Sequence, residues 1–278
     1  MPSLEWMGKK EALGYKAPFY TLEHKYTFNA QNSDNMIQKN NILFANLNYK
    51  DLLKEMSKQN ILVDCILTDP PYCVSRKHQL GFSNMGRSGM DYGNWDYNFD
   101  QIKWICDCLP FLKQGGSIII FNDWKNFSFI AEILEQNGCA IKDLLRWEKQ
   151  NPMPRNVNSR YVGDCEFAIR AVKGKKKWTF NKPSEISYLK PVFKSGVVLG
   201  GKNRLHPTQK HLEIIKEILK IHTNEDDLIF DPFSGSGTTA VAALALNRKF
   251  IGSEIEKEYY QKAKRRLYDC FATQLSWK

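Results

Sequence analysis

The stretch "LIFDPFSGSGTTAVAALAL", Leu228–Leu246, decides the fold. Its apolar start ends at Asp231, as a buried strand does; a serine and glycine turn follows, and an alanine-rich helix begins at Thr238. Glycines in such a turn permit positive φ and let a ligand approach the backbone closely. The helix N-terminus presents free N–H groups to a carboxylate or phosphate. The stretch therefore predicts a strand, a ligand-binding turn and a helix.

The turn narrows the choice of ligand. A nucleotide-triphosphate loop needs Gly-Lys-Ser/Thr, and here two threonines follow Gly237. The dinucleotide fingerprint is met in a looser form, with Ala240 in the place of the third glycine, so a nicotinamide or flavin cofactor stays open. The next strand, "KFIGSE", ends in Glu254, where such folds place an acid that binds ribose hydroxyls. The pattern predicts a cofactor that contains adenosine.

A second informative stretch is "ILTDPPYCVS", Ile66–Ser75. An apolar run ends abruptly in Asp69-Pro70-Pro71-Tyr72, and two prolines can continue neither a ladder nor a helix. One interpretation is a strand-ending turn capped by an aspartate with a core tyrosine. The other is a rigid polar site at the carboxyl end of a buried strand.

Apolar runs alternate with segments of helical spacing along most of the chain, which predicts βαβ units and a mainly parallel sheet with helices on both faces. The expected helices contain residues 47–56, 127–134, 212–219 and 241–245. The expected strands are 42–45, 61–67, 117–121, 140–147, 167–172, 228–230 and 249–252.

Composition limits the functional classes. The chain has 278 residues, and 40 Lys and Arg against 30 Asp and Glu give a net charge of +10. This excess favours a nucleic-acid partner if it is clustered, and a solvated basic surface if it is not. No long uncharged apolar run and no signal peptide are present, so we expect a cytoplasmic protein without a membrane segment. Seven cysteines without a Cys-x-x-Cys, and five scattered histidines, argue against disulfides and metal sites.

Three regions break the alternation. Residues 1–40 are polar with scattered aromatics, and we expect an arm packed on the main domain. Residues 75–98 form a long glycine-rich segment, and residues 151–203 mix basic and aromatic residues with proline. Such segments are typical of functional loops that contact nucleic acid, or of solvated insertions.

The motifs together resemble one family. "DPPY" at 69–72 and "DPFSGSGTT" at 231–239 are similar to motifs of the S-adenosylmethionine-dependent amino-methyltransferases of DNA. "HPTQK" at 206–210 and "FIGSEIEKEYYQKAKRRL" at 250–267 extend the resemblance. The catalytic motif precedes the cofactor motif, an order that resembles the β class, with a restriction-modification-like leader in "EWMGK" and "APFYTLEH".

This resemblance implies a Rossmann-like methyltransferase domain over 41–278, with a target-recognition region at about 150–205. It implies that the Asp69 carboxylate and the Pro70 carbonyl accept hydrogen bonds from the exocyclic amine of an extruded adenine and localise its lone pair towards the sulfonium methyl. Pro71 stiffens this frame and Tyr72 stacks on the base. Asp at position 69 favours adenine N6 over cytosine N4, which remains the alternative.

The cofactor implied is S-adenosylmethionine. The strand before the catalytic one ends in Asn46, where relatives usually have an acidic residue. The implied cofactor-binding residues are Ala45, Asn46, Asp69, Thr208, Lys210, Asp231, Phe233, Ser234, Gly235, Ser236, Gly237, Thr238 and Glu254.

Double-stranded DNA is the expected partner. Arg155, Asn156 and Arg160 follow a predicted strand and suit guanine and adenine edges, while Lys175, Lys176 and Lys177 suit phosphates. The motif order implies a homodimer, and the leader implies a possible cognate restriction endonuclease. The remaining alternatives are methylation of an RNA base or a protein glutamine, and a DNA-binding relative that has lost catalysis.

Overall fold

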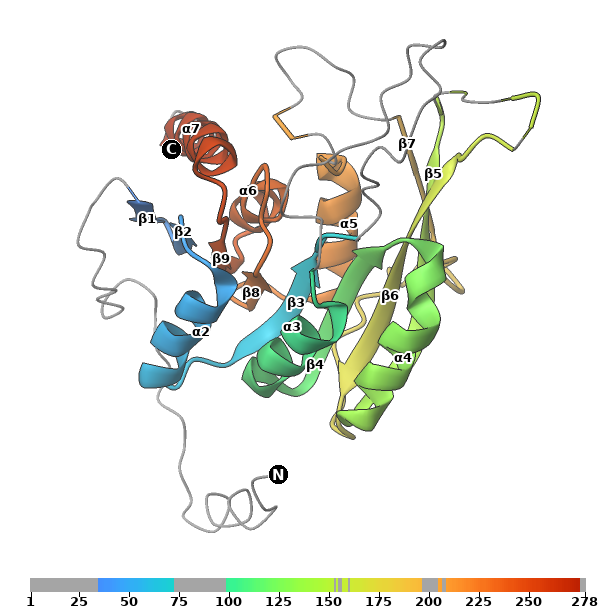
Figure 1. Ribbon diagram of the computed structural model, residues 1–278, viewed down its shortest axis with the longest axis horizontal. Coiled ribbons are helices and arrows are strands. Elements are labelled where there is room, and N and C mark those ends of the chain that lie inside the picture. The colour runs from blue at the N-terminus through green and yellow to red at the C-terminus, as the bar shows by residue number, and fades with distance from the viewer. Residues whose placement is uncertain are drawn as a thin grey trace, which may run out of the picture.

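The computed structural model describes residues 35–72, 99–152, 154, 157–159, 161–196, 205–206 and 209–275. Their nine strands form one sheet in the order β1-β2-β9-β8-β3-β4-β6-β5-β7 (Figure 1). The strands are β1 (Met36–Lys39), β2 (Ile42–Ala45), β3 (Val63–Thr68), β4 (Leu112–Asn122), β5 (Cys139–Lys149), β6 (Cys165–Lys173), β7 (Val192–Ser195), β8 (Leu228–Asp231) and β9 (Lys249–Ser253).

The sheet is mostly parallel. Strands β2, β9, β8, β3 and β4 run in one direction, and β5 and β7 are parallel to each other. Strands β1 and β6 run antiparallel to their neighbours. The expected α/β fold with a mainly parallel sheet is confirmed.

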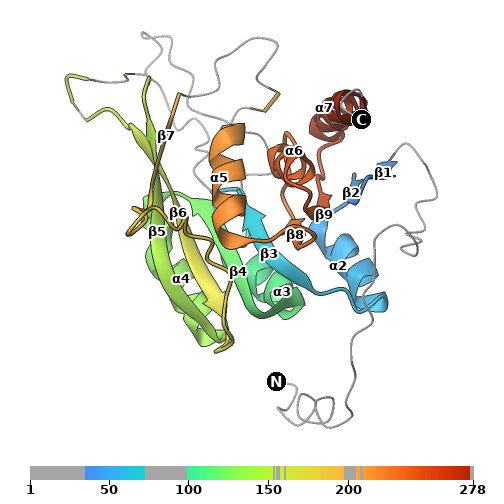
Figure 2. The ribbon, with the colours of Figure 1, turned by 180° about the vertical axis from the view of Figure 1, so that it is seen from behind.

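Helices cover both faces of the sheet. Helices α2, α3 and α4 lie on the face towards the viewer in Figure 1, and α5, α6 and α7 lie on the face seen in Figure 2. Successive residues of β4 supply the two cores, because strand side chains alternate between faces: Ile118 and Ile120 pack with one helix layer, and Ile119 and Phe121 with the other. The helices are α2 (Tyr49–Lys58), α3 (Gln101–Cys108), α4 (Phe127–Gln136), α5 (Leu212–His222), α6 (Thr238–Ala245) and α7 (Lys257–Leu275), with 3-10 turns η4 (Leu109–Phe111) and η5 (Trp124–Asn126).

Four helices and strands were not predicted, and the C-terminal helix α7 is the longest of them. Strand β1 belongs to the end of the expected arm and pairs with β2, while α3 follows the glycine-rich segment and β7 lies inside the expected target-recognition region. Most of the arm (1–34) and all of 75–98 lie outside the described residues.

Neither a membrane-crossing helix nor a metal-binding group of His, Cys, Asp or Glu occurs within the ranges given above.

The sheet has a switch point between β3 and β8. These parallel neighbours pair through Cys65↔Ile229 and Ile66↔Phe230. The next described helix after β3 is α3, on one face, whereas β8 leads into α6 on the opposite face. Such a reversal opens a crevice at the carboxyl ends of the strands, where ligands of α/β proteins bind.

Candidate active site

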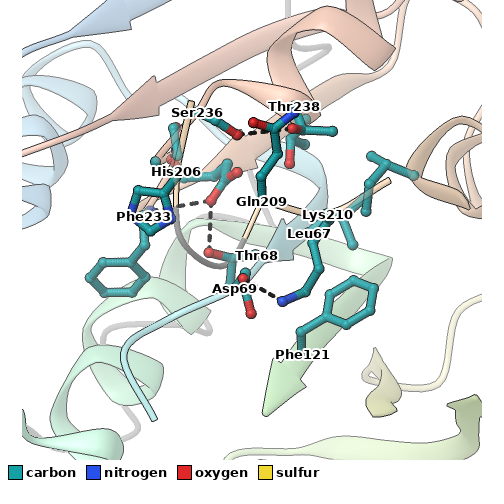
Figure 3. Close-up of a pocket in the computed structure, with 15 residues that line it drawn as sticks. Leu67, Thr68, Asp69, Phe121, His206, Gln209, Lys210, Phe233, Ser236 and Thr238 are labelled. Carbon is teal, nitrogen blue, oxygen red and sulfur yellow. Dashed lines mark hydrogen bonds and ion pairs between the residues drawn. The ribbon is translucent and has the colours of Figure 1, made fainter. Parts of the chain in front are cut away.

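A pocket of about 440 Å³, counting its open mouth, lies at this switch point (Figure 3). It brings the residue that follows β3, Asp69, together with the glycine turn that follows β8. Residues from the segment before α5 close one side. The lining residues are Leu67, Thr68, Asp69, Phe121, His206, Gln209, Lys210, Ile215, Asp231, Phe233, Ser234, Gly235, Ser236, Thr238 and Thr239.

The glycine turn has the conformation that its sequence predicts. Gly235 has φ of 50° and Gly237 has φ of 70°, a left-handed region that side chains rarely adopt. Gly237 is also the N-cap of α6, and a Cβ there would lie 3.2 Å from the Cβ of Ala263 in α7. Glycine therefore serves both backbone conformation and close packing at this position.

Glu254 ties the glycine turn to the end of β9. Its carboxylate accepts hydrogen bonds from the N–H of Gly235 and the N–H of Glu256, each at 2.8 Å. The Asn46 amide donates to the carbonyl of Glu254 at 2.7 Å, so this departure from the family pattern fixes the same segment. Burial raises the pKa of Glu254 to about 7. The fully buried Ala45 accepts from the Glu254 N–H at 3.0 Å.

Asp231 joins the two motif strands. Its Oδ1 accepts from the Thr68 hydroxyl of β3 at 2.7 Å and from the Phe233 N–H at 3.2 Å. Burial raises the pKa of the Asp231 carboxyl to about 6, against the opposing effect of these hydrogen bonds. The side chain therefore holds the turn in place and still lines the pocket.

Arg266 of α7 is a site residue that sequence reasoning missed. Its guanidinium donates to the carbonyl of Ser236 at 3.1 Å and to the Thr238 hydroxyl at 3.0 Å. The Ser236 and Thr238 hydroxyls are themselves 3.1 Å apart. This network fixes the start of α6, and only the similarity of "KRRL" to the family motif pointed to its neighbourhood.

Aromatic side chains flank the turn. The Phe233 ring packs on Tyr49, Phe99 and Trp104, with ring centroids 5.2 to 5.4 Å apart. His206 lies across the turn and contacts the ring of Tyr259, with centroids 4.2 Å apart. The Phe233 ring is therefore anchored on the α2 and α3 side while it lines the pocket.

The DPPY motif is held by hydrogen bonds from two sides. Asn126, at the end of η5, donates to the carbonyl of Tyr72 at 3.2 Å, and Gln101 of α3 donates to the carbonyl of Pro71. The Tyr72 hydroxyl donates to Oδ1 of Asp69. A rigid frame thus presents Asp69 at the pocket, as the two prolines predict.

Lys210 lies at the aspartate rather than at the glycine turn. Its Nζ is 2.6 Å from Oδ2 of Asp69 and 3.2 Å from the Tyr72 hydroxyl, and Figure 3 shows it directed at the carboxylate. It is also 3.0 Å from Oε2 of Glu166 on β6, whose other oxygen is 2.8 Å from Lys149 on β5. Sequence reasoning missed Glu166 and Lys149, since neither belongs to a motif.

Burial and ion pairing oppose each other in this cluster. Burial raises the pKa of Asp69, and Lys210 partly offsets this. Burial alone would raise the pKa of Glu166, but Lys210 and Lys149 reverse the effect and lower it to about 2. Burial also opposes the charge on Lys210, yet Asp69 and Glu166 raise its pKa overall. The Lys210 cation therefore lowers the pKa of both carboxylates against the effect of burial.

Of the predicted DNA-binding residues, the structure describes Lys175–Lys177, and these do not line the pocket. Lys175–Lys177 follow β6, whose end pairs with the start of β4, and the Lys177 carbonyl lies against Gly115. They therefore lie at the opposite edge of the sheet, roughly 30 Å from the motif at about 3.3 Å per strand residue. Arg155, Asn156 and Arg160 lie outside the described residues, as does Thr208.

The pocket suits S-adenosylmethionine. The N-terminus of α6 faces the pocket. Glu254 does not line the pocket itself, but its carboxylate accepts from the N–H of Gly235, which does. Asp69 lines the same pocket as the glycine turn, so a methyl donor held by the turn would share the pocket with this carboxylate.

Comparison with known proteins agrees with this geometry. The DNA methylase family model matches residues 63–265, which is most of the chain, and the chain belongs to this family. Type II methyltransferase M2.MboI of Moraxella bovis is 35% identical over 76% of this chain and 82% of its own length. Type II methyltransferase M2.LlaDCHI of Lactococcus lactis subsp. cremoris is 34% identical over 83% of this chain and 90% of its own length.

A solved structure shows the same fold with the cofactor. The crystal structure of the M1.HpyAVI–SAM complex is 42% identical and has a TM-score of 0.68, over 81% of this chain and 98% of that chain. The chain is therefore a DNA methyltransferase of the restriction-modification kind that uses S-adenosylmethionine. The expected family, enzyme class and cofactor are confirmed.

Proposed function

We propose that this enzyme transfers a methyl group to the N6 amine of adenine at specific DNA sites. The observation that carries the proposal is that the rigid motif ending β3 and the glycine turn ending β8 share one pocket. A target amine and a methyl donor that are both bound in this pocket lie close enough to react. Aspartate at the first motif position supports adenine over cytosine, as the family resemblance implies.

The first task of the site is to prepare the amine. The N6 lone pair of adenine is delocalised into the ring, so the nitrogen is a poor nucleophile. Asp69 accepts one N–H and the Pro70 carbonyl accepts the other, which favours tetrahedral geometry at nitrogen and directs its lone pair at the methyl. Bound S-adenosylmethionine supplies an electrophilic methyl on a sulfonium sulfur.

The second task is to manage charge and the proton. As the N–C bond forms and the S–C bond breaks, the positive charge passes from sulfur to nitrogen. The ionised Asp69 stabilises that charge, and one N–H proton then leaves to solvent by way of this carboxylate. Tyr72, held by Asn126 and by its bond to Asp69, provides an aromatic face for the extruded base.

The surface beside the motif supports DNA approaching from the carboxyl edge of the sheet. Trp124 and Lys125 lie on η5, one turn from the residue that holds Tyr72, and the Trp124 side chain is 67% exposed. An exposed aromatic with an adjacent lysine suits stacking and phosphate contact. We place Arg155, Asn156 and Arg160 at base edges as a part of this proposal.

Tritium transfer from labelled S-adenosylmethionine to oligonucleotide duplexes tests the proposal. A duplex in which the target adenine is replaced by purine, which lacks the N6 amine, should accept no label. A duplex in which cytosine is replaced by an analogue that lacks the N4 amine should accept label at the normal rate. Label that depends on cytosine N4, or label on RNA or protein in place of DNA, would overturn the proposal.

Assembly and partners are further proposals. The family's motif order supports a homodimer acting in the cytoplasm on DNA, and the similarity to Type II methyltransferases supports a cognate restriction endonuclease. Analytical ultracentrifugation at micromolar concentration tests the dimer: a sedimentation coefficient of the monomer over the whole range would exclude it. The proposed endonuclease is tested by expressing a candidate nuclease together with this enzyme and measuring whether the methylated DNA is protected from cleavage.

A further inference from the structure

Lys210 lies between two carboxylates, and only one of them belongs to the catalytic motif. The Lys210 side chain is 7% exposed, and its Nζ is 2.6 Å from Asp69 and 3.0 Å from Glu166. A lysine paired with one aspartate forms a neutral ion pair. The second carboxylate changes that balance, because two half-buried carboxylates and one buried ammonium group, with charges −1, −1 and +1, carry a net charge of −1.

The net negative charge of Asp69, Lys210 and Glu166 bears on the rate of methyl transfer. Positive charge develops on the target nitrogen during transfer, beside Asp69. An Asp69 carboxylate cancelled by Lys210 would stabilise this charge weakly, since the lysine repels it from nearly the same distance. Glu166 offsets the lysine in turn, so the field of Asp69 at the target nitrogen is partly restored.

We propose that Glu166 is a positioning residue for methyl transfer, which binds Lys210 and leaves the Asp69–Lys210–Glu166 group with a net negative charge that stabilises the developing cation. The inference rests on the proposed role of Asp69. It assigns to β6 a part in the reaction that no sequence motif carries.

The surrounding charges do not remove the stabilisation of the developing cation by this three-residue group. Lys149 contacts Glu166 at 2.8 Å and offsets a part of its charge, but among the described residues no ion pair joins Lys149 to Asp69. The Lys149 side chain is also 19% exposed, so solvent screens it more than it screens Lys210. The other titratable groups that act on this cluster are Tyr72 after β3, Asp123 before η5 and Asp231 at the end of β8.

Glu166→Gln tests the inference, because it removes the charge and keeps the shape. Glu148→Gln is the matched control: Glu148 lies on β5, pairs with Arg146 at 2.6 Å and Lys194 at 3.1 Å, and its side chain is 27% exposed against 29% for Glu166. Glu148 faces the other side of the sheet, since its neighbour Trp147 is the cross-strand partner of Glu166.

The measurement is the single-turnover rate of methyl transfer against pH, with saturating cofactor and duplex. Glu166→Gln should lower the plateau rate about 10- to 100-fold, the scale of one unit charge that acts on the target nitrogen through two successive ion pairs. Its acid limb should move to lower pH, because the charge of Glu166 raises the pKa of Asp69. Cofactor affinity should stay within threefold, Glu166→Asp should recover part of the rate, and Glu148→Gln should match the wild type.

Two results would overturn the inference. A plateau rate within twofold of the wild type means that the Glu166 charge is not used. A lower rate with an acid limb that stays or moves to higher pH means that Glu166 only holds Lys210 in its place. Asp69→Ala is measured in parallel: if it stays active, the proposed function fails, whereas an inactive Asp69→Ala beside a normal Glu166→Gln rejects this inference alone.

Discussion

Glu254→Gln should weaken cofactor binding and stabilise the ligand-free protein at the same time. The carboxylate is 8% exposed and accepts two backbone N–H groups, yet burial raises its pKa from 4.5 to about 7. The ionised form that binds hydroxyl donors is therefore the form that the folded protein disfavours. Sites that bind ligands often carry such a conflict between stability and activity.

The sign and size of the change in folding stability follow from proton linkage. Between pH 4.5 and 7 the unfolded chain releases a proton that folded Glu254 retains, so stability is present below pH 4.5 and is lost as the pH rises to 7. About 1.4 kcal/mol per pH unit gives a loss of about 3 kcal/mol above pH 7. Glutamine cannot ionise, so this loss is avoided. Its amide, however, accepts only one of the two hydrogen bonds from backbone N–H groups, which costs about 1 kcal/mol. The expected net gain is about 2 kcal/mol at pH 8.

Urea unfolding of the ligand-free enzymes at pH 8 and pH 5, and calorimetric titration with S-adenosylmethionine at pH 8, measure both effects. The gain in stability should be present at pH 8 and vanish near pH 5, where wild-type Glu254 is largely protonated in the folded state. Affinity should fall by about 1–3 kcal/mol, the scale of hydrogen bonds to a charged group. Glu258, whose side chain is 78% exposed and pairs with Lys262, is changed to Gln as the control and should show neither effect.

Two outcomes would refute this reasoning. Equal destabilisation of Glu254→Gln at both pH values means that the carboxylate is not strained by burial. Unchanged affinity at pH 8 means that the ribose binds elsewhere, and that Glu254 serves only to hold the turn.

Three further predictions follow from the described geometry and from the recognition region. Gly252→Ala should destabilise the fold by about 1–3 kcal/mol in urea unfolding, because the new Cβ would lie 2.4 Å from the buried ring of Phe250; wild-type stability would contradict this. Changing Lys175–Lys177 together to alanine should leave the methylation rate of a short duplex and its salt dependence unaltered, and a flatter salt dependence would show that DNA reaches the far edge of the sheet. Arg155→Ala and Arg160→Ala should change which sites appear in a methylome, whereas a uniform loss of rate at the same sites would make them backbone contacts.

Much of the fold followed from the sequence because local patterns and global structure agree. The strand that ends at Asp231 and the turn around Gly235 and Gly237 were predicted from residue types alone. Asp69 was predicted at the end of a buried strand because two prolines must stop β3. Topology then explains why two motifs far apart in the chain meet, since β3 and β8 are neighbours in the sheet.

The remaining site residues could not be predicted because no local pattern marks them. Glu166 lies on β6, an antiparallel strand that reaches the site only through its pairing with β4 and β5. The same holds for Lys149. Lys210 was assigned to the cofactor by its motif, and the structure shows that it lines the pocket and that its ammonium group pairs with Asp69 there. Such contacts depend on strand order and register, which composition and periodicity do not define.

The central claim is that Asp69 accepts a hydrogen bond from the adenine amine, and nucleoside mass spectrometry tests it most directly. Duplex DNA is incubated with the wild-type enzyme or with Asp69→Ala, digested, and analysed for methylated nucleosides, while calorimetry measures the affinity of each enzyme for S-adenosylmethionine. We predict N6-methyladenine from the wild type and none above background from Asp69→Ala, with affinities within tenfold. Methylation by Asp69→Ala near the wild-type rate, or N4-methylcytosine as the wild-type product, would contradict the claim.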